Sequence, residues 1–398
     1  MKLGHGPRVA VVGGGIGGMA AAAFLHRAGI AVTVFEQARE LGEVGAGVVV
    51  APNAVRLLRR LGGGGRLQDL GVRMEVGWEF RRWQDGRVIS AEDLDEACER
   101  LYGEHTYTMH RADLLDTVRA AVPEEVVRLG ARCVGVAQGA TGATLTFADG
   151  SQDRADLVVG ADGVHSVVRG TVTEPSPPEY SGLCAYRALV PVEDAPELAR
   201  RRAHTLWIGP DHHLVHYLVS GGRLVNLVAF APAGHHSKES WSATATLDEL
   251  RAEFEGWDPR LTDLVDAAGT PGRWALLDRA PLVRWGTGRV TLLGDAAHPM
   301  FPFYAQGAAQ ALEDAATLAR CLAADIQHPE RALRRYEEVR SPRTARVQAA
   351  SRARAHVNHL PDGPDQRARD EELSAADPLV SSGWIYGHDP EAAFVDAR

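Results

Sequence analysis

The residues best suited to chemistry lie where short apolar segments end. The segment VAVV leads into a turn in which Gly13, Gly15 and Gly18 occupy the positions of GxGxxG. The first glycine makes the turn, the second lets the backbone approach a pyrophosphate, and the third lets a helix pack on the strand. Gly17 lies in the same turn, and Glu36, which ends the next apolar segment, is placed to hold ribose hydroxyls. The unit predicts a dinucleotide site; the alternative is a glycine-rich turn without a ligand.

Two later apolar segments end in the same way. DLVVGADG carries Asp162 and VTLLGDAAHP carries Asp295. If these strands lie in one parallel sheet, their carboxyl ends meet at one edge and face one extended ligand. Without that ligand, a carboxylate at Asp295 would be a costly buried charge.

The segment HPMFPFYAQG follows Asp295 and precedes a predicted helix that starts at Gly307 and Ala308. Small residues at a helix start let a ligand reach its N–H groups, which can stabilise an anion by ~3 kcal/mol when water is excluded. The prolines stiffen the loop, so Pro302 and Phe303 are predicted to wall the ligand and a substrate. The alternative is an aromatic loop that only packs on the core.

A second group of polar residues lies in segments with the alternation of β-strands. In DHHLVHYLVS, a strand period places His213 and Tyr217 on one face and His212 and His216 on the other. An imidazole and a phenol on one face can bind and help deprotonate a phenolic substrate. The alternatives are polar residues on a solvated sheet face and, disfavoured because the faces split the histidines, a metal site.

These motifs, in this order, resemble the single-component FAD-dependent aromatic hydroxylases with the para-hydroxybenzoate hydroxylase fold, in the branch of salicylate, 3-hydroxybenzoate and 6-hydroxynicotinate hydroxylases. The resemblance covers essentially the whole chain. It implies an α/β fold with a Rossmann-like FAD-binding domain, an inserted, mostly antiparallel β-sheet substrate domain and C-terminal helices. The expected division assigns 1–75, 105–175 and 286–325 to the FAD-binding domain, 76–104 and 176–285 to the substrate domain, and 326–398 to the helical segment.

The resemblance also implies roles for single residues. Asp295 would bind the FAD ribityl region, Asp162 would contact both FAD and the pyrophosphate of the nicotinamide donor, and Val48 would lie near the flavin ring. Arg111 would contact the sugar and phosphate side of the flavin, unless it is only a surface arginine at a helix start. Arg187 is expected either to pair with a substrate carboxylate or to serve as a structural or FAD-side arginine.

The implied activity is hydroxylation of a small phenolic aromatic or heteroaromatic acid through a flavin C4a-hydroperoxide. It uses non-covalent FAD, O2, and NADH or NADPH as co-substrate. Pro302 replaces a glutamine favoured by 3-hydroxybenzoate 6-hydroxylases, and Phe303 replaces a histidine of the 6-hydroxynicotinate enzymes. Alternatives are a hydroxylase of a larger aromatic natural product, a flavin oxidase or dehydrogenase without oxygen insertion, and a regulatory FAD-binding protein.

Composition narrows the remaining classes. A net charge of −9 argues against nucleic acid as a partner, and no segment is long and apolar enough to predict a membrane span. Four scattered cysteines fit reduced thiols, so we expect a soluble, cytoplasmic monomer or homodimer. The arginine-rich segment 328–360 is predicted to be a solvated, salt-bridged helix with a break at Ser341-Pro342.

Overall fold

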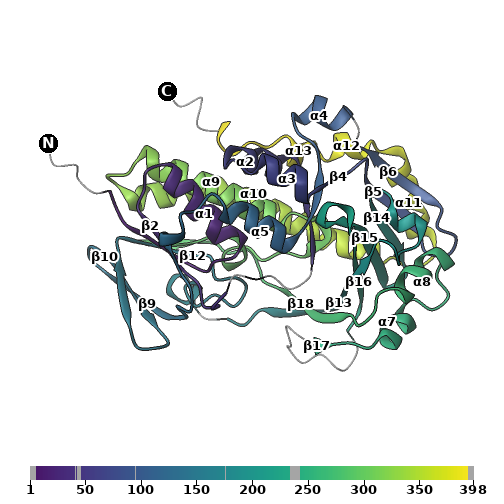
Figure 1. Cartoon of the computed structure of the whole chain (residues 1–398), viewed down its shortest axis with the longest axis horizontal. Coiled ribbons are helices and arrows are strands. Elements are labelled where there is room, and N and C mark those ends of the chain that lie inside the picture. Colours follow the sequence, from purple (N-terminus) through teal and green to yellow (C-terminus); the bar gives the residue numbers. More distant parts are fainter. Residues whose placement is uncertain are drawn as a thin grey trace.

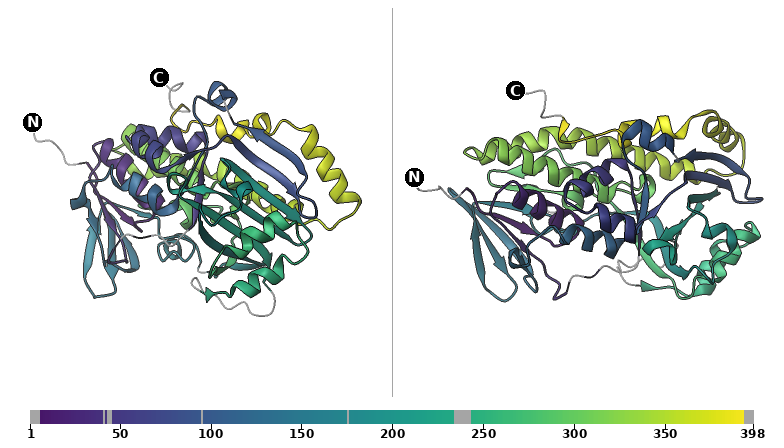
Figure 2. Two further views of the ribbon diagram at one scale, coloured as in Figure 1. Left: turned by 45° about the vertical axis from the view of Figure 1, so that its right-hand side comes forward. Right: turned by 45° about the horizontal axis from the view of Figure 1, so that its top comes forward.

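The molecule is elongated, with a large sheet toward each end (Figures 1 and 2). The computed structural model describes residues 6–40, 42, 46–94, 96–174, 176–233 and 243–392. No helix in these ranges has the length and apolar content needed to cross a membrane.

The first large sheet carries the glycine turn. Its strands run in the order β19 (Gly286–Thr287), β20 (Val290–Leu292), β12 (Leu157–Gly160), β1 (Val9–Val12), β2 (Val32–Phe35) and β8 (Val127–Arg128). Every pair from β20 to β8 is parallel, so the carboxyl ends of β1, β12 and β20 meet at one edge. The strands are rich in valine because both faces of the sheet are covered.

Helices and a small β-meander cover this sheet. The helices include α1 (Ile16–Arg27), α5 (Arg111–Arg119) and α9 (Gly307–Ala324), and the meander consists of β9 (Cys133–Gly139), β10 (Gly142–Phe147) and β11 (Gln152–Ala155). Buried alanines on α1 and α9 let these two helices pack closely. Phe35 of β2 meets Phe147 of β10 at 4.9 Å between ring centroids, which places the meander against the sheet.

The second large sheet is mostly antiparallel. Its order is β17 (Ala243–Thr244), β18 (Gly272–Asp278), β13 (Glu179–Pro191), β16 (Leu224–Pro232), β15 (His212–Val219), β14 (Ala203–Gly209), β5 (Val76–Arg82) and β6 (Val88–Asp93). Only β14 and β5 pair in parallel among the neighbours described. Helices α7 (Leu247–Glu253) and α8 (Pro259–Asp266) lie beside it (Figure 1).

A three-stranded sheet packs against the second large sheet. It pairs β3 (Gly47–Val50), β7 (Tyr107–His110) and β4 (Val72–Arg73) in the order β3-β7-β4. The amide N of Gly47 donates to Oδ1 of Asn226 on β16 at 2.7 Å. A Cβ on Gly47 would lie 2.6 Å from the ring of Tyr217, so the absence of a side chain here lets β3 approach the antiparallel sheet.

Helix α10 (Pro329–Asn358) runs along the molecule beside α9 (Figure 2). Its 30 residues are continuous, about 45 Å at the usual rise. The predicted break at Ser341-Pro342 is therefore wrong. A proline removes one N–H and disturbs the preceding turn, but Tyr336, Arg340 and Thr344 are buried on both sides of it, and this packing holds the helix together.

The remaining short elements lie around these layers. They include α2 (Pro52–Arg60), α3 (Gly64–Leu70), α4 (Glu96–Tyr102), α6 (Arg169–Val172), α11 (Pro364–Ala375), α12 (Pro378–Ser381), α13 (Gly383–Tyr386) and the 3-10 turns η5 (Gly294–Ala296) and η6 (Pro302–Tyr304). The mostly parallel first sheet, the mostly antiparallel second sheet and the C-terminal helices confirm the predicted fold class. The domain boundaries stay a prediction.

Candidate active site

In the glycine turn after β1, most of the glycines pack tightly against the protein, whereas one faces open space. Gly13 has φ +105°, and a Cβ there would lie 2.3 Å from the carbonyl oxygen of Ala161. A Cβ on Gly18 would lie 1.9 Å from the carbonyl oxygen of Gly13, and one on Gly17 would lie 2.8 Å from a leucine side chain. A Cβ on Gly15 would meet no heavy atom of the described chain within 4 Å. Gly15 is thus where a phosphate can approach the start of α1.

Glu36 lies beside this turn. Its Oε2 accepts a hydrogen bond from the amide N of Gly14 at 2.6 Å, and its Oε1 accepts one from Ala38 at 2.8 Å. Two backbone donors therefore fix the carboxylate at the sheet edge. An ionised carboxylate has further lone pairs, which suit the hydroxyls of a ribose.

The turn after β12 uses its aspartate internally. Asp162 accepts hydrogen bonds from the Ser166 hydroxyl at 2.5 Å and from the amides of Val167 and Val168 at 2.7 and 3.2 Å. Burial raises the pKa of Asp162, and these hydrogen bonds oppose that rise. Because the side chain holds the turn, a ligand at this position is best served by the backbone of Asp162 and its neighbours.

Asp295 is exposed at the end of β20, so the expectation of a buried charge there is wrong. Gly294, with φ +60°, turns the chain so that Asp295 faces outward while Ala296 is buried. The buried carboxylate at this point is Asp314 of α9. Its Oδ2 accepts from the amide N of Gly294 at 3.0 Å and lies 2.5 Å from Nε2 of His298.

The start of α9 has no side-chain cap. Gln306, at the N-cap, accepts from Nδ2 of Asn53 through its side-chain oxygen at 3.0 Å and so does not cap the helix. A Cβ on Gly307 would meet nothing within 4 Å of the described chain, and Ala308 is half-buried. Uncapped N–H groups facing open space suit an anionic ring system.

Beneath this helix start lies a buried ionic cluster that sequence reasoning missed. Arg340 of α10, fully buried, donates to Glu313 Oε2 at 2.6 Å and to Asp314 Oδ1 at 2.7 Å, and Arg343 donates to both oxygens of Glu313. Burial would raise the pKa of Glu313, but the two guanidiniums hold it at about 2. The interpretation of segment 328–360 as a solvated helix is therefore wrong for Arg340, which anchors α10 to α9.

The antiparallel sheet presents His213 and Tyr217 on one face, both buried. They meet different neighbours. His213 stacks on Phe230 at 4.3 Å between ring centroids, and Tyr217 lies 5.2 Å from the ring of His204 on β14. Burial lowers the pKa of His204 to about 3 and raises the pKa of Tyr217, which the Arg187 guanidinium opposes. His204, which sequence reasoning did not name, is thus a neutral imidazole beside the Tyr217 phenol.

Arg187 of β13 joins the same face. Its guanidinium lies 5.2 Å from the Trp274 ring centroid, and its Nε has no hydrogen-bond partner within the described chain. Burial lowers the pKa of Arg187, and the nearby positive charge of Arg111 lowers it further. Arg111 begins α5, where its amide N donates to Ala46 at 2.8 Å. Two guanidiniums within electrostatic range suit an anionic ligand.

The remaining predicted residues lie around this face. Phe303 is buried and meets the His213 ring at 5.1 Å, whereas Pro302 is exposed. Val48 is half-buried on β3, next to the Gly47 that contacts Tyr217. The structure therefore brings together Phe303 and His213 on one side, and Arg187, Tyr217 and the β3 segment on the other.

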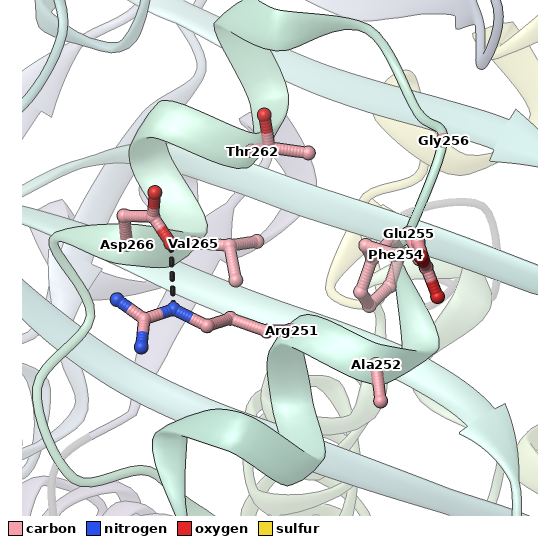
Figure 3. Close-up of a pocket in the computed structure, with 8 residues that line it drawn as sticks. All are labelled: Arg251, Ala252, Phe254, Glu255, Gly256, Thr262, Val265 and Asp266. Carbon is pink, nitrogen blue, oxygen red and sulfur yellow. Dashed lines mark hydrogen bonds and ion pairs between the residues drawn. The ribbon is translucent and has the colours of Figure 1, made fainter.

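Two surface grooves lie outside this site. One, of about 570 Å³ between α7 and α8, is lined by residues 251–266 and crossed by the ion pair of Arg251 and Asp266 (Figure 3). It contains none of the predicted site residues. The other, of about 450 Å³, includes Arg169 and Arg279 in its lining, and Arg169 also donates to the carbonyl oxygens of Ala296 and Ala297 beside Asp295.

The residues at the edge of the first sheet fit FAD. Gly15 and Gly307 leave open space at two helix starts, and a carboxylate and an exposed aspartate lie beside them. This set would accept a pyrophosphate, a ribose and a flavin ring in turn.

Comparison with known proteins agrees with this fit. Residues 7–351 match a family described as FAD binding domain. The chain is 44% identical over 392 residues to 3-amino-4-hydroxybenzoate 2-monooxygenase of Streptomyces platensis, covering 98% of each chain. It is 37% identical over 353 residues to 6-hydroxynicotinate 3-monooxygenase of Pseudomonas fluorescens, covering 88% of this chain and 91% of that one. The solved structure of HpxO of Klebsiella pneumoniae, complexed with FAD and uric acid, aligns with TM-score 0.83 at 28% identity, covering 96% of both chains.

These findings confirm the predicted resemblance and FAD as the cofactor. The 3-amino-4-hydroxybenzoate enzyme is a relative that sequence reasoning did not name. The chain belongs to the FAD-binding family of aromatic-ring monooxygenases.

Proposed function

We propose that the protein hydroxylates a small aromatic acid that carries a phenolic hydroxyl, using O2 and a nicotinamide donor. The observation that carries this proposal is the sheet face on which His213, Tyr217 and Arg187 lie, facing the β3 segment through Gly47. Bound FAD would supply the activation of O2, which amino-acid side chains do not provide.

Tyr217 and His213 prepare the ring. A phenolic hydroxyl that is hydrogen-bonded to these groups loses its proton more easily, and the resulting phenolate is a more electron-rich ring. His204 is neutral at physiological pH, and its ring on β14 packs against the Tyr217 ring and holds it in place. Tyr217→Phe should lower the hydroxylation rate about 10²-fold with FAD content unchanged, and the peroxide released per donor consumed should rise.

Arg187 holds the acid group. Its buried guanidinium gains most from a ligand carboxylate, because a charge in a poorly solvated site is costly until it is paired. Trp274 fixes the guanidinium by packing on its face. We propose that Arg187 sets the orientation of the substrate, with the carboxylate on β13 and the hydroxyl toward β15.

Among aromatic acids, 3-amino-4-hydroxybenzoate is the first candidate, because a relative named for it is 44% identical to this chain. The experiment is a panel of 3-amino-4-hydroxybenzoate, 6-hydroxynicotinate, salicylate and 3-hydroxybenzoate, scored by donor consumption and product mass. The proposal expects at least one acid to gain one oxygen atom. Consumption of donor with peroxide as the sole product for every acid would refute it.

We also propose that NADH or NADPH binds at the groove that includes Arg169 and Arg279. Both side chains are more than nine-tenths buried, and each pKa is lowered, first by burial. The positive charge of Arg279 lowers the pKa of Arg169 further, to about 10. A phosphate in the groove would relieve this repulsion. The hydrogen bonds from Arg169 to Ala296 and Ala297 connect the groove to the turn that carries Asp295.

Donor binding is tested by stopped-flow reduction of the flavin with NADH and with NADPH. Arg279→Met should raise the donor concentration for half-maximal reduction roughly tenfold or more, since a charge-assisted hydrogen bond contributes about 1.5–3 kcal/mol. Substrate affinity should not change. A variant with wild-type donor dependence would place the donor elsewhere.

The reduced, buried cysteines fit our proposal of a cytoplasmic location.

A further inference from the structure

His213 has a partner that comes from the far end of the chain. Its Nδ1 lies 2.5 Å from Nε2 of His359, the C-cap residue of α10, across 146 positions of sequence. At this distance one imidazole donates its N–H to the other. The pair therefore joins the substrate face of β15 to the end of the longest helix.

The surroundings of the pair are asymmetric. His213 is 1% exposed and lies between the rings of Phe230 and Phe303, which cannot accept its proton. His359 is partly exposed, and its carbonyl oxygen accepts from the amide N of Asp211 on the loop before β15. The two imidazoles thus extend from the buried substrate face toward solvent.

The titratable groups that face the pair are themselves imidazoles. His212 on β15 and His356 on α10 lower the pKa of His359 after burial, to about 4, and burial, His359 and His212 lower that of His213. His212 is held by Glu253 of α7 at 2.8 Å. Within the described chain, no carboxylate contacts either ring of the pair, so both are neutral at pH 7.

We propose that His359 is a positioning residue that carries the phenolic proton of the substrate away from His213 to solvent. The inference rests on the proposed function, because it needs a phenolic substrate. The O–H bond of the phenol breaks, and its proton goes to Nε2 of His213. In the same concerted step, His213 passes its Nδ1 proton to Nε2 of His359, and His359 releases its Nδ1 proton to water. The phenolate keeps the electron pair. Both imidazoles are neutral again, and each now carries its proton on Nε2 instead of Nδ1.

This relay solves a problem of the buried site. A proton that stayed on His213 would create an imidazolium between two phenylalanine rings, and a buried charge without a partner is costly. That proton would therefore return to the phenolate. Sharing the proton with a partly exposed partner lets the phenolate persist until the ring reacts.

The test measures proton release when the flavoprotein binds the hydroxylated acid selected from the panel, by stopped flow with a pH indicator and by phenolate absorbance. His359→Gln keeps a polar side chain but cannot take up a proton, and His356→Gln, an exposed histidine one turn earlier, is the matched control. Proton release should slow about 10²-fold in His359→Gln and rise again linearly with buffer concentration, with substrate affinity within a factor of two. His356→Gln should behave as the wild type.

Wild-type proton release in His359→Gln, independent of buffer, would overturn the relay. The wild-type protein gives a second check if that variant does not fold. Because several protons move together, a plot of the proton-release rate against the deuterium fraction of the solvent should be curved. A straight line in that plot would overturn the relay. If the wild type neither releases a proton nor hydroxylates any phenol, the proposed function fails instead.

Discussion

The substitution Gly15→Val should weaken FAD binding roughly 150-fold while the apoprotein still folds. Gly15 has φ −72° and ψ −175°, a conformation open to any residue, and an added Cβ meets nothing within 4 Å of the described chain. The side chain would instead fill the space of the pyrophosphate. Loss of two charge-assisted hydrogen bonds of about 1.5 kcal/mol each amounts to about 3 kcal/mol, or roughly 150-fold in Kd.

The assay is FAD titration of the apoprotein by fluorescence quenching, with urea unfolding of the same apoprotein. The free energy of unfolding should fall by no more than about 1 kcal/mol, because Gly15 is the N-cap of α1 and valine caps a helix poorly. Gly18→Ala is the matched control, because its Cβ would lie 1.9 Å from the carbonyl oxygen of Gly13. That variant should be destabilised even without FAD. Wild-type FAD affinity in Gly15→Val would refute the placement of the pyrophosphate.

Three further predictions follow from burial and charge. Asp295→Ala should weaken FAD binding about tenfold or more while leaving apoprotein stability unchanged, because the side chain is exposed; unchanged flavin occupancy in a titration would contradict its assigned role. Arg187→Met should raise the KM for a carboxylated substrate roughly tenfold or more but leave that for its carboxamide analogue almost unchanged, and equal effects on both would exclude the carboxylate contact. The pKa of His204 is lowered from 6.5 to about 3, so the unfolded state binds a proton more readily than the folded state. The free energy of unfolding should therefore fall as the pH drops from 6.5 to about 3, by about 1.4 kcal/mol per pH unit for this group. In His204→Gln this part of the acid sensitivity should be absent from urea unfolding curves measured between pH 4 and 7.

Local patterns predicted the parts of the site that depend on neighbours in sequence. The spacing of Gly13, Gly15 and Gly18 identifies the turn because each glycine answers a backbone constraint of that turn. The shared face of His213 and Tyr217 follows from the two-residue period of a strand. The fold class followed from the resemblance of the ordered motifs to a known family of FAD-dependent hydroxylases.

The parts that were missed depend on contacts between distant segments. His204 reaches Tyr217 through the register of β14 against β15, and His359 reaches His213 from the end of α10. Arg340 is solvated in a helix considered alone but is buried once α10 packs on α9. Asp295 was expected to be buried because it ends a buried strand, yet one turn at Gly294 points it outward.

The most direct test of the central claim is the mass of the product formed under 18O2. The flavoprotein is supplied with NADH or NADPH and with 3-amino-4-hydroxybenzoate, and then with the other acids of the panel. We expect one acid to be converted to a product with a single added 18O atom, in an amount matching the donor consumed minus the peroxide released. Products without 18O, or oxidation of donor that no acid stimulates, would contradict it.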